Sequence, residues 1–81
     1  MKVTLRYFAL AAELAGRSEE TLDLAAGATA GDALSRAREL HPALAHPGFT
    51  PLLAVNRRHA EPSWTLSGDD EIALFPPVSG G

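Results

Sequence analysis

The sequence predicts an α+β fold in which a small sheet is covered on one face by a single main helix. Residues 3–7 and 71–75 each alternate apolar with polar side chains, which indicates strands with one buried face. Residues 30–40 carry apolar side chains at helical spacing, with most charged ones on the other side, as in an amphipathic helix. No internal repeat or linker interrupts these elements, so we expect one two-layer domain.

The region before the main helix predicts a short helix and a second strand. Residues 8–15 are rich in good helix formers and are followed by Gly16, which suits the left-handed residue that ends many helices. Residues 21–24 alternate again, so we expect a strand with Leu22 and Leu24 facing the core.

The main helix has a start signal and a stop signal. Thr29 suits its N-cap, and Asp32, three residues later, occupies the position of the capping-box acid. His41 precedes Pro42, and the residue before a proline is disfavoured in the α region, so the helix should end there.

The second half of the chain predicts short strands joined by loops. Residues 42–51 contain three prolines and a glycine, which indicates an irregular loop. We expect Leu44 and Phe49 to pin this loop to the body. Residues 52–55 predict a strand, and residues 56–59 predict a turn.

The last strand fixes which way its side chains face. It follows an extended piece at residues 63–66 and a turn at residues 67–70. If Ile72 and Leu74 face the core, Phe75 faces outward. An outward aromatic residue near the end of the chain suits a docking surface for a partner, whereas the alternative is that Phe75 packs under a loop.

Composition excludes several classes of function. The chain has 81 residues with 10 acidic and 7 basic side chains, a net charge of −3, and no basic excess that would indicate nucleic-acid binding. The absence of cysteine excludes disulfides and thiolate metal sites. Neither a signal peptide nor a membrane-spanning run is recognised. We therefore expect a soluble cytoplasmic protein without a membrane partner.

The C-terminus carries the strongest functional signal. Pro76 and Pro77 cannot donate to a sheet ladder, so pairing should fail at about Phe75. The chain then ends in Gly80 and Gly81, which have no side chains and could pass through a narrow channel. These features predict a semi-rigid stalk with a free carboxylate at its tip.

The chemistry of that tip indicates a group carrier. The ionised Gly81 carboxylate is a poor electrophile, and the chain has no phosphate-binding loop with which to activate it. A partner enzyme would therefore supply ATP, and the chain alone would catalyse nothing. The alternative is that the terminal glycines are incidental, because chain ends are often small and disordered.

Other polar residues are better explained by structure. The spacing of His41, His46 and His59 matches no metal site, so we expect surface or loop histidines. Asp69 and Asp70 precede a strand and are expected to form a turn.

The remaining candidates are weak. Arg57 and Arg58 could bind a phosphate or an acidic partner, but adjacent arginines in a turn are usually solvated. Ser67 and Ser79 have no recognisable histidine base. Lys2 is the only lysine, which disfavours a tag that forms chains through its own lysines.

Several segments resemble the small subunit of molybdopterin synthase, over essentially the full length. They are Val3 to Ala9, Leu10 to Gly16, Leu53 to Asn56, the turn and strand Gly68 to Ile72, and the tail Phe75-Pro76-Pro77-Val78-Ser79-Gly80-Gly81. The tail is the most specific part. The resemblance implies a ubiquitin-like β-grasp domain at residues 1–75, with first and last strands paired at the centre of the sheet, and an extended tail at residues 76–81.

The resemblance also implies a sulfur-carrier cycle. An E1-like enzyme would adenylate Gly81, and a sulfur donor would convert it to a thiocarboxylate. The tail, including Pro76 to Gly80, would then thread into the large synthase subunit in a two-by-two heterotetramer. There the sulfur would pass to cyclic pyranopterin monophosphate, with no cofactor bound to this chain. The alternatives are a sulfur carrier for thiamine, cysteine or tRNA thiolation, a ubiquitin-like modifier, and an interaction domain whose tail is incidental.

Overall fold

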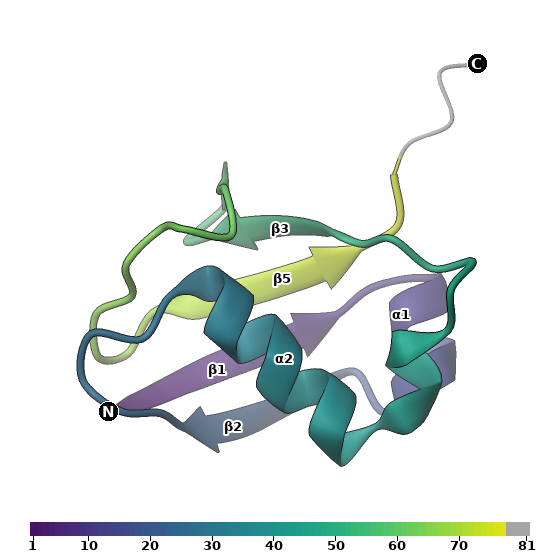
Figure 1. Cartoon of the computed structure of the whole chain (residues 1–81), viewed down its shortest axis with the longest axis horizontal. Coiled ribbons are helices and arrows are strands. Elements are labelled where there is room, and N and C mark those ends of the chain that lie inside the picture. The colour runs from purple at the N-terminus through teal and green to yellow at the C-terminus, as the bar shows by residue number, and fades with distance from the viewer. Residues whose placement is uncertain (78–81) are drawn as a thin grey trace.

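The computed structural model describes residues 1–77 and has two layers, a mixed sheet of five strands and one main helix across its face (Figure 1). The elements are β1 (Lys2–Tyr7), α1 (Leu10–Ala15), β2 (Glu19–Asp23), α2 (Ala30–Leu40), the 3₁₀ helix η1 (Pro42–Ala45), β3 (Leu52–Val55), β4 (Arg58–His59) and β5 (Glu71–Phe75). The strand order is β2-β1-β5-β3-β4. The expected α+β arrangement is confirmed.

The first and last strands form the centre of the sheet. β1 and β5 pair in parallel, with Leu5 opposite Ile72 and Tyr7 opposite Leu74. All four side chains are buried, as is Val3. Strict alternation thus gives the sheet one face that packs on the helix layer and one that faces away from it.

The main helix approaches the sheet closely because its buried face is small. Ala30, Ala33 and Ala37 are fully buried, so little side-chain volume separates the helix from the strands. The predicted capping box is confirmed: Thr29 Oγ1 accepts from the Asp32 N–H at 3.2 Å, and Asp32 Oδ2 accepts from the Thr29 N–H at 2.8 Å. A box of this kind stabilises a helix by about 1 kcal/mol.

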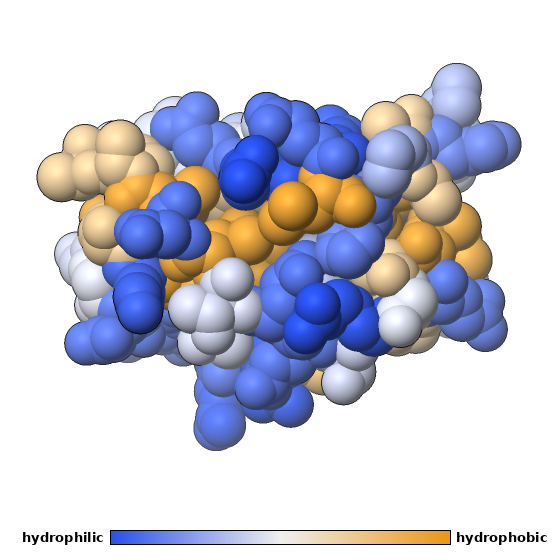
Figure 2. Space-filling model, turned by 90° about the horizontal axis from the view of Figure 1, so that it is seen from below, coloured by the Kyte–Doolittle hydropathy of each residue, from blue (hydrophilic) through white to orange (hydrophobic). Residues whose placement is uncertain are grey.

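The boundary between the two layers is visible from the side. Seen from below (Figure 2), an apolar band crosses the molecule between two hydrophilic borders. Leu24 and Leu34 are partly buried residues that pack against the core. Leu40, which the helical pattern assigned to the buried face, is 43% exposed because it lies in the last turn.

The structure shifts the ends of two predicted elements. The helix predicted at residues 8–15 begins at Leu10, because Ala9 has a φ of 52° and cannot be helical. Its end is confirmed, since Gly16 adopts the left-handed conformation with a φ of 73°. β2 spans Glu19–Asp23 rather than residues 21–24, and Leu22 faces the core as expected.

The turn predicted at residues 56–59 is wrong in part. Only Asn56 and Arg57 turn, with φ values of 50° and 71°, as in the tight two-residue turns of β-hairpins. Arg58 and His59 pair with β3 and form the short strand β4.

The other loop predictions are confirmed in most respects. Leu44 and Phe49 are buried and pin the proline-rich loop, which also contains η1. Asp70 acts as a turn residue, because its carboxylate accepts from the Ser67 N–H at 2.8 Å and from Asn56 Nδ2 at 2.9 Å. Of residues 63–66, Thr65 makes an isolated bridge to Thr29. None of the helices in the described range is long and apolar enough to cross a membrane.

Candidate docking face

The last strand ends where the sequence predicts. β5 stops at Phe75, and Pro76 and Pro77 follow it outside the sheet. Neither proline has an N–H to continue the ladder. The predictions made for Val78, Ser79, Gly80 and Gly81 concern residues outside the described range.

Phe75 lies on the sheet face that points away from α2. Ile72 and Leu74 are fully buried on the helix side, whereas Ala73 and Phe75 are partly exposed on the other side, so the predicted phase is confirmed. Phe75 is half-buried, and its ring packs edge-on against His59 of β4 with centroids 5.7 Å apart. It therefore packs beside a strand rather than under a loop.

Two further apolar residues lie beside Phe75. Leu52 is its cross-strand partner on β3 and is 37% exposed. Phe8 is 44% exposed, and its N–H donates to the Leu74 carbonyl at 3.0 Å, which places it next to the end of β5. We call Phe8, Leu52 and Phe75 the docking face.

Phe8 is not among the predicted docking residues, because a helix was predicted at residues 8–15, whereas α1 begins at Leu10. The signal was present: with Val3, Leu5 and Tyr7 inward, alternation puts Phe8 outward. The contact with Arg6 supports this outward position of Phe8, since the Arg6 guanidinium carbon lies 5.6 Å from the centroid of the Phe8 ring. A cation over a ring at this distance favours one ring position.

Arg6 is held by acidic groups from the neighbouring strands. Its Nε lies 3.8 Å from a Glu19 oxygen, and its Nη1 lies 3.6 Å from a Glu71 oxygen. Nε is buried and, within residues 1–77, has no hydrogen-bond partner. These distances are too long for hydrogen bonds, so the two carboxylates act on the guanidinium through their charge rather than through directional contacts.

His41 lies in the connection between α2 and η1, as expected for a loop histidine, but its side chain is partly buried in a polar cluster. Its Nε2 lies 2.6 Å from Glu20 Oε1, and its ring packs edge-on against Tyr7 at 5.8 Å. The Tyr7 hydroxyl donates to the same Glu20 oxygen at 2.6 Å, and Arg17 Nη1 lies 3.1 Å from the other oxygen. Among residues 1–77, no group of three histidine, aspartate or glutamate side chains could hold a metal ion.

The contacts of Glu20 with Tyr7, Arg17 and His41 connect β1 and β2 to the end of α2. Burial raises the pKa of the Glu20 carboxyl, but the hydrogen bonds from Tyr7 and His41 and the charges of His41 and Arg17 outweigh it, so the net pKa lies below its ordinary value. Burial also raises the pKa of the Tyr7 hydroxyl, and the hydrogen bond to Glu20 raises it further. Tyr7 therefore stays protonated as a donor.

Comparison with known proteins identifies the family. The sequence pattern of the ThiS family matches residues 5–81. The chain belongs to the ThiS family. A relative, the molybdopterin synthase sulfur carrier subunit of Chlamydomonas reinhardtii, is 37% identical over 83 residues, and the match covers all of both chains. The resemblance to the molybdopterin synthase small subunit is thereby confirmed.

Solved structures show the same fold as this ThiS-family chain. The crystal structure of SAMP1, a small archaeal modifier protein from Haloferax volcanii, matches with a TM-score of 0.89 and 35% identity over all of both chains. A chain in the complex of subunits 1 and 2 of the molybdopterin-converting factor from Helicobacter pylori matches with a TM-score of 0.69 and 22% identity, again over both whole chains. The fold is therefore the ubiquitin-like β-grasp.

Proposed function

We propose that this ThiS-family chain is the sulfur-carrier subunit of a molybdopterin synthase, with Gly81 as the group that carries sulfur. The observation behind the proposal is the position of the tail. The central strand β5 ends at Phe75 beside an exposed apolar face, two prolines follow, and the sequence finishes in Gly80 and Gly81. A relative named as such a subunit matches the whole chain.

The proposed chemistry starts at the Gly81 carboxylate. An E1-like enzyme transfers AMP from ATP to this carboxylate and releases pyrophosphate. A sulfur donor then displaces AMP and leaves a thiocarboxylate, in which sulfur replaces one oxygen. The thiocarboxylate donates its sulfur to cyclic pyranopterin monophosphate in the large subunit, and hydrolysis, in which water supplies the oxygen, regenerates the Gly81 carboxylate. This chain supplies the carried group, while its partners supply the active sites.

The docking face contains the residue after which the tail begins. Phe75 belongs to the face and is also the last residue before Pro76 and Pro77. A partner that binds the face thus fixes the starting point of the tail, which reduces the loss of conformational freedom when the tip is held. Exposed aromatic side chains are suited to this role, because they bury a large area at a small entropic cost.

The proposed partner is the large synthase subunit, in a heterotetramer with two copies of each chain. The structurally similar chain from Helicobacter pylori belongs to a complex of subunits 1 and 2 of the molybdopterin-converting factor. Each product molecule takes two sulfur atoms, so the carrier has to leave and be charged again. A face of only a few apolar residues suits such reversible binding.

Two kinds of variant test this proposal. Deleting Gly81, or adding one residue after it, should abolish sulfur transfer in a reconstituted synthase without changing the urea unfolding curve, because β5 has already ended at Phe75. Phe75→Ala should weaken binding to the large subunit about tenfold or more. Trp64→Ala is the matched control. Trp64 is also an exposed aromatic residue, at 50%, but it lies next to the start of α2, where its carbonyl accepts from the Ala30 N–H. Full transfer by the extended chain would contradict the proposal.

A second function is supported by the likeness to the small archaeal modifier protein, with its TM-score of 0.89. In that case Gly81 would be joined to lysines of other proteins. The two functions differ in their products. Isopeptide adducts on target proteins, found by mass spectrometry of a digest, would identify the modifier, whereas a free thiocarboxylate identifies the carrier.

A further inference from the structure

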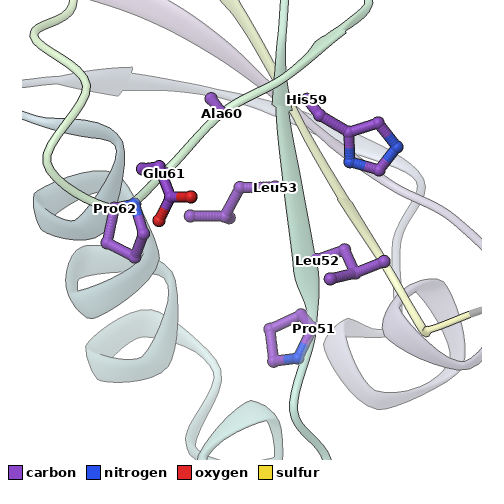
Figure 3. A pocket seen from close by; sticks show the side chains of 7 residues that line it. All are labelled: Pro51, Leu52, Leu53, His59, Ala60, Glu61 and Pro62. Carbon is purple, nitrogen blue, oxygen red and sulfur yellow. The ribbon is translucent and has the colours of Figure 1, made fainter.

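A hollow of about 280 Å³ lies beside the docking face, at the edge of the sheet where β4 has only two residues (Figure 3). It lies between β3 and the segment that follows β4 (Figure 3). The residues that line it are Pro51, Leu52, Leu53, His59, Ala60, Glu61 and Pro62.

The hollow exists because the chain leaves β3 early. After His59, one backbone hydrogen bond continues the pairing between β4 and β3: the Ala60 N–H donates to the Leu53 carbonyl at 3.0 Å. The Pro62 carbonyl then accepts from the Gly31 N–H at 2.8 Å, which draws this segment to the start of α2. Contact there is close, since a Cβ on Gly31 would lie 3.1 Å from the Pro62 oxygen. The space beside the first half of β3 is left open.

Apart from His59 and Glu61, the side chains that line the hollow are apolar, but polar and apolar atoms contribute nearly equal shares of its surface. Figure 3 shows the Glu61 carboxylate turned towards the β3 side of the hollow. Within the described range, no cationic side chain lies within ion-pair distance of Glu61. A mixed lining with apolar side chains and one unpaired carboxylate matches a side chain that has a methylene stem and a cationic head.

The hollow is continuous with the docking face. Leu52 belongs to both, because it pairs with Phe75 and lines the hollow. His59 also belongs to both, since its ring packs on Phe75 and the residue contributes to the lining of the hollow. A protein that covers the docking face therefore also covers the mouth of the hollow.

We propose that the hollow receives an arginine or lysine side chain from the protein that binds the docking face. The stem of that side chain packs between Pro51, Leu52 and Pro62, and its head pairs with Glu61. This inference rests on the proposed function for the existence of the partner. It further specifies the surface of that partner, which carries a cationic side chain next to the apolar patch that meets Phe75. The net charge of −3 agrees with a basic partner surface.

The experiment measures the affinity of the full chain for its large synthase subunit by titration calorimetry, at low and at high salt. Glu61→Gln keeps the shape and removes the charge, and should raise Kd about three- to tenfold at low salt, with a smaller effect at high salt. Glu61→Lys should raise Kd further. Ala60→Leu, which narrows the hollow without altering charge, should raise Kd at both salt concentrations.

Glu39→Gln is the matched control, because Glu39 is an exposed glutamate on α2, in the helix layer. Circular dichroism and urea unfolding show whether each variant is folded. If Glu61→Gln and Ala60→Leu bind as well as the natural chain while Phe75→Ala binds weakly, the hollow proposal is overturned and the docking face stands. If Phe75→Ala also binds normally, the docking face itself is wrong. An equal loss in Glu39→Gln would contradict a local role for Glu61.

Discussion

The clearest prediction about stability concerns Glu20, whose side chain is only 10% exposed. Its carboxylate accepts from Tyr7 at 2.6 Å and from His41 at 2.6 Å, and it forms an ion pair with Arg17 at 3.1 Å. These partners come from β1, from the residue after α2 and from the segment before β2. Glu20→Gln preserves the shape of the side chain and removes the charge that all three partners share.

The expected cost follows from these contacts. A hydrogen bond to a charged group contributes about 1.5–3 kcal/mol. The glutamine carbonyl can still accept from Tyr7 and His41, which share one oxygen of Glu20, but without the negative charge; its amide group is a donor and faces Arg17. Arg17 is half exposed, so water compensates most of that loss. We therefore expect Glu20→Gln to lower the free energy of unfolding by about 2–4 kcal/mol at pH 7.

The assay is urea unfolding followed by circular dichroism, with Glu13→Gln as the control at an exposed glutamate of α1. The pKa of Glu20 is lower in the folded chain than its ordinary value of 4.5. As the pH falls below that value, the unfolded chain binds the proton more readily, so the stability that the carboxylate contributes is lost through the folded-state pKa. The difference between the natural chain and Glu20→Gln should therefore shrink under acid conditions. A difference below about 0.5 kcal/mol at pH 7, or one that persists unchanged at pH 2, would refute this reasoning.

Three further predictions concern local structure. Tyr7→Phe should lower the free energy of unfolding by about 1–2 kcal/mol at pH 8. Because the pKa of Tyr7 in the folded chain is raised from 10.0, the natural chain should lose this extra stability as the pH rises above 10. Urea unfolding at pH 8 and at pH 11 would show the difference. Thr29→Ala removes the N-cap and should cost about 0.5–2 kcal/mol, measured by thermal unfolding. Arg57→Gly should instead stabilise the hairpin by about 0.4–1 kcal/mol, because Arg57 has a φ of 71°. A lower melting temperature for Arg57→Gly would contradict the assigned turn.

Features set by near neighbours could be predicted from the sequence. The capping box at Thr29 and Asp32 depends on four consecutive residues, and the left-handed Gly16 depends on one. The phase of β5 was predictable because Ile72 and Leu74 can reach the core only from one face. The end of β5 followed from the two prolines after Phe75.

Features that depend on distant residues could not be predicted. The hydrogen bond from Tyr7 to Glu20 joins residues 13 apart, and the contact from His41 to Glu20 joins residues 21 apart. Nothing in the local pattern of His41 distinguishes it from an exposed histidine. β4 was missed for a different reason, because arginine seldom takes the positive φ that Arg57 adopts.

The docking face was predictable only in part. Alternation along β5 gave Phe75, but Phe8 and Leu52 join it through pairing between strands that are far apart in the sequence. The hollow beside Glu61 is further removed from any sequence signal. It depends on the hydrogen bond between Pro62 and Gly31, which links the segment after β4 to the main helix.

The central claim is that Gly81 carries sulfur, and intact mass spectrometry tests it most directly. The full chain is incubated with its E1-like enzyme, ATP and a sulfur source, alongside a chain that lacks Gly81. We expect a gain equal to the replacement of one oxygen by sulfur, located by fragmentation at Gly81 and absent from the shortened chain. An unchanged mass, with an E1-like enzyme shown to be active on another carrier, would contradict the claim.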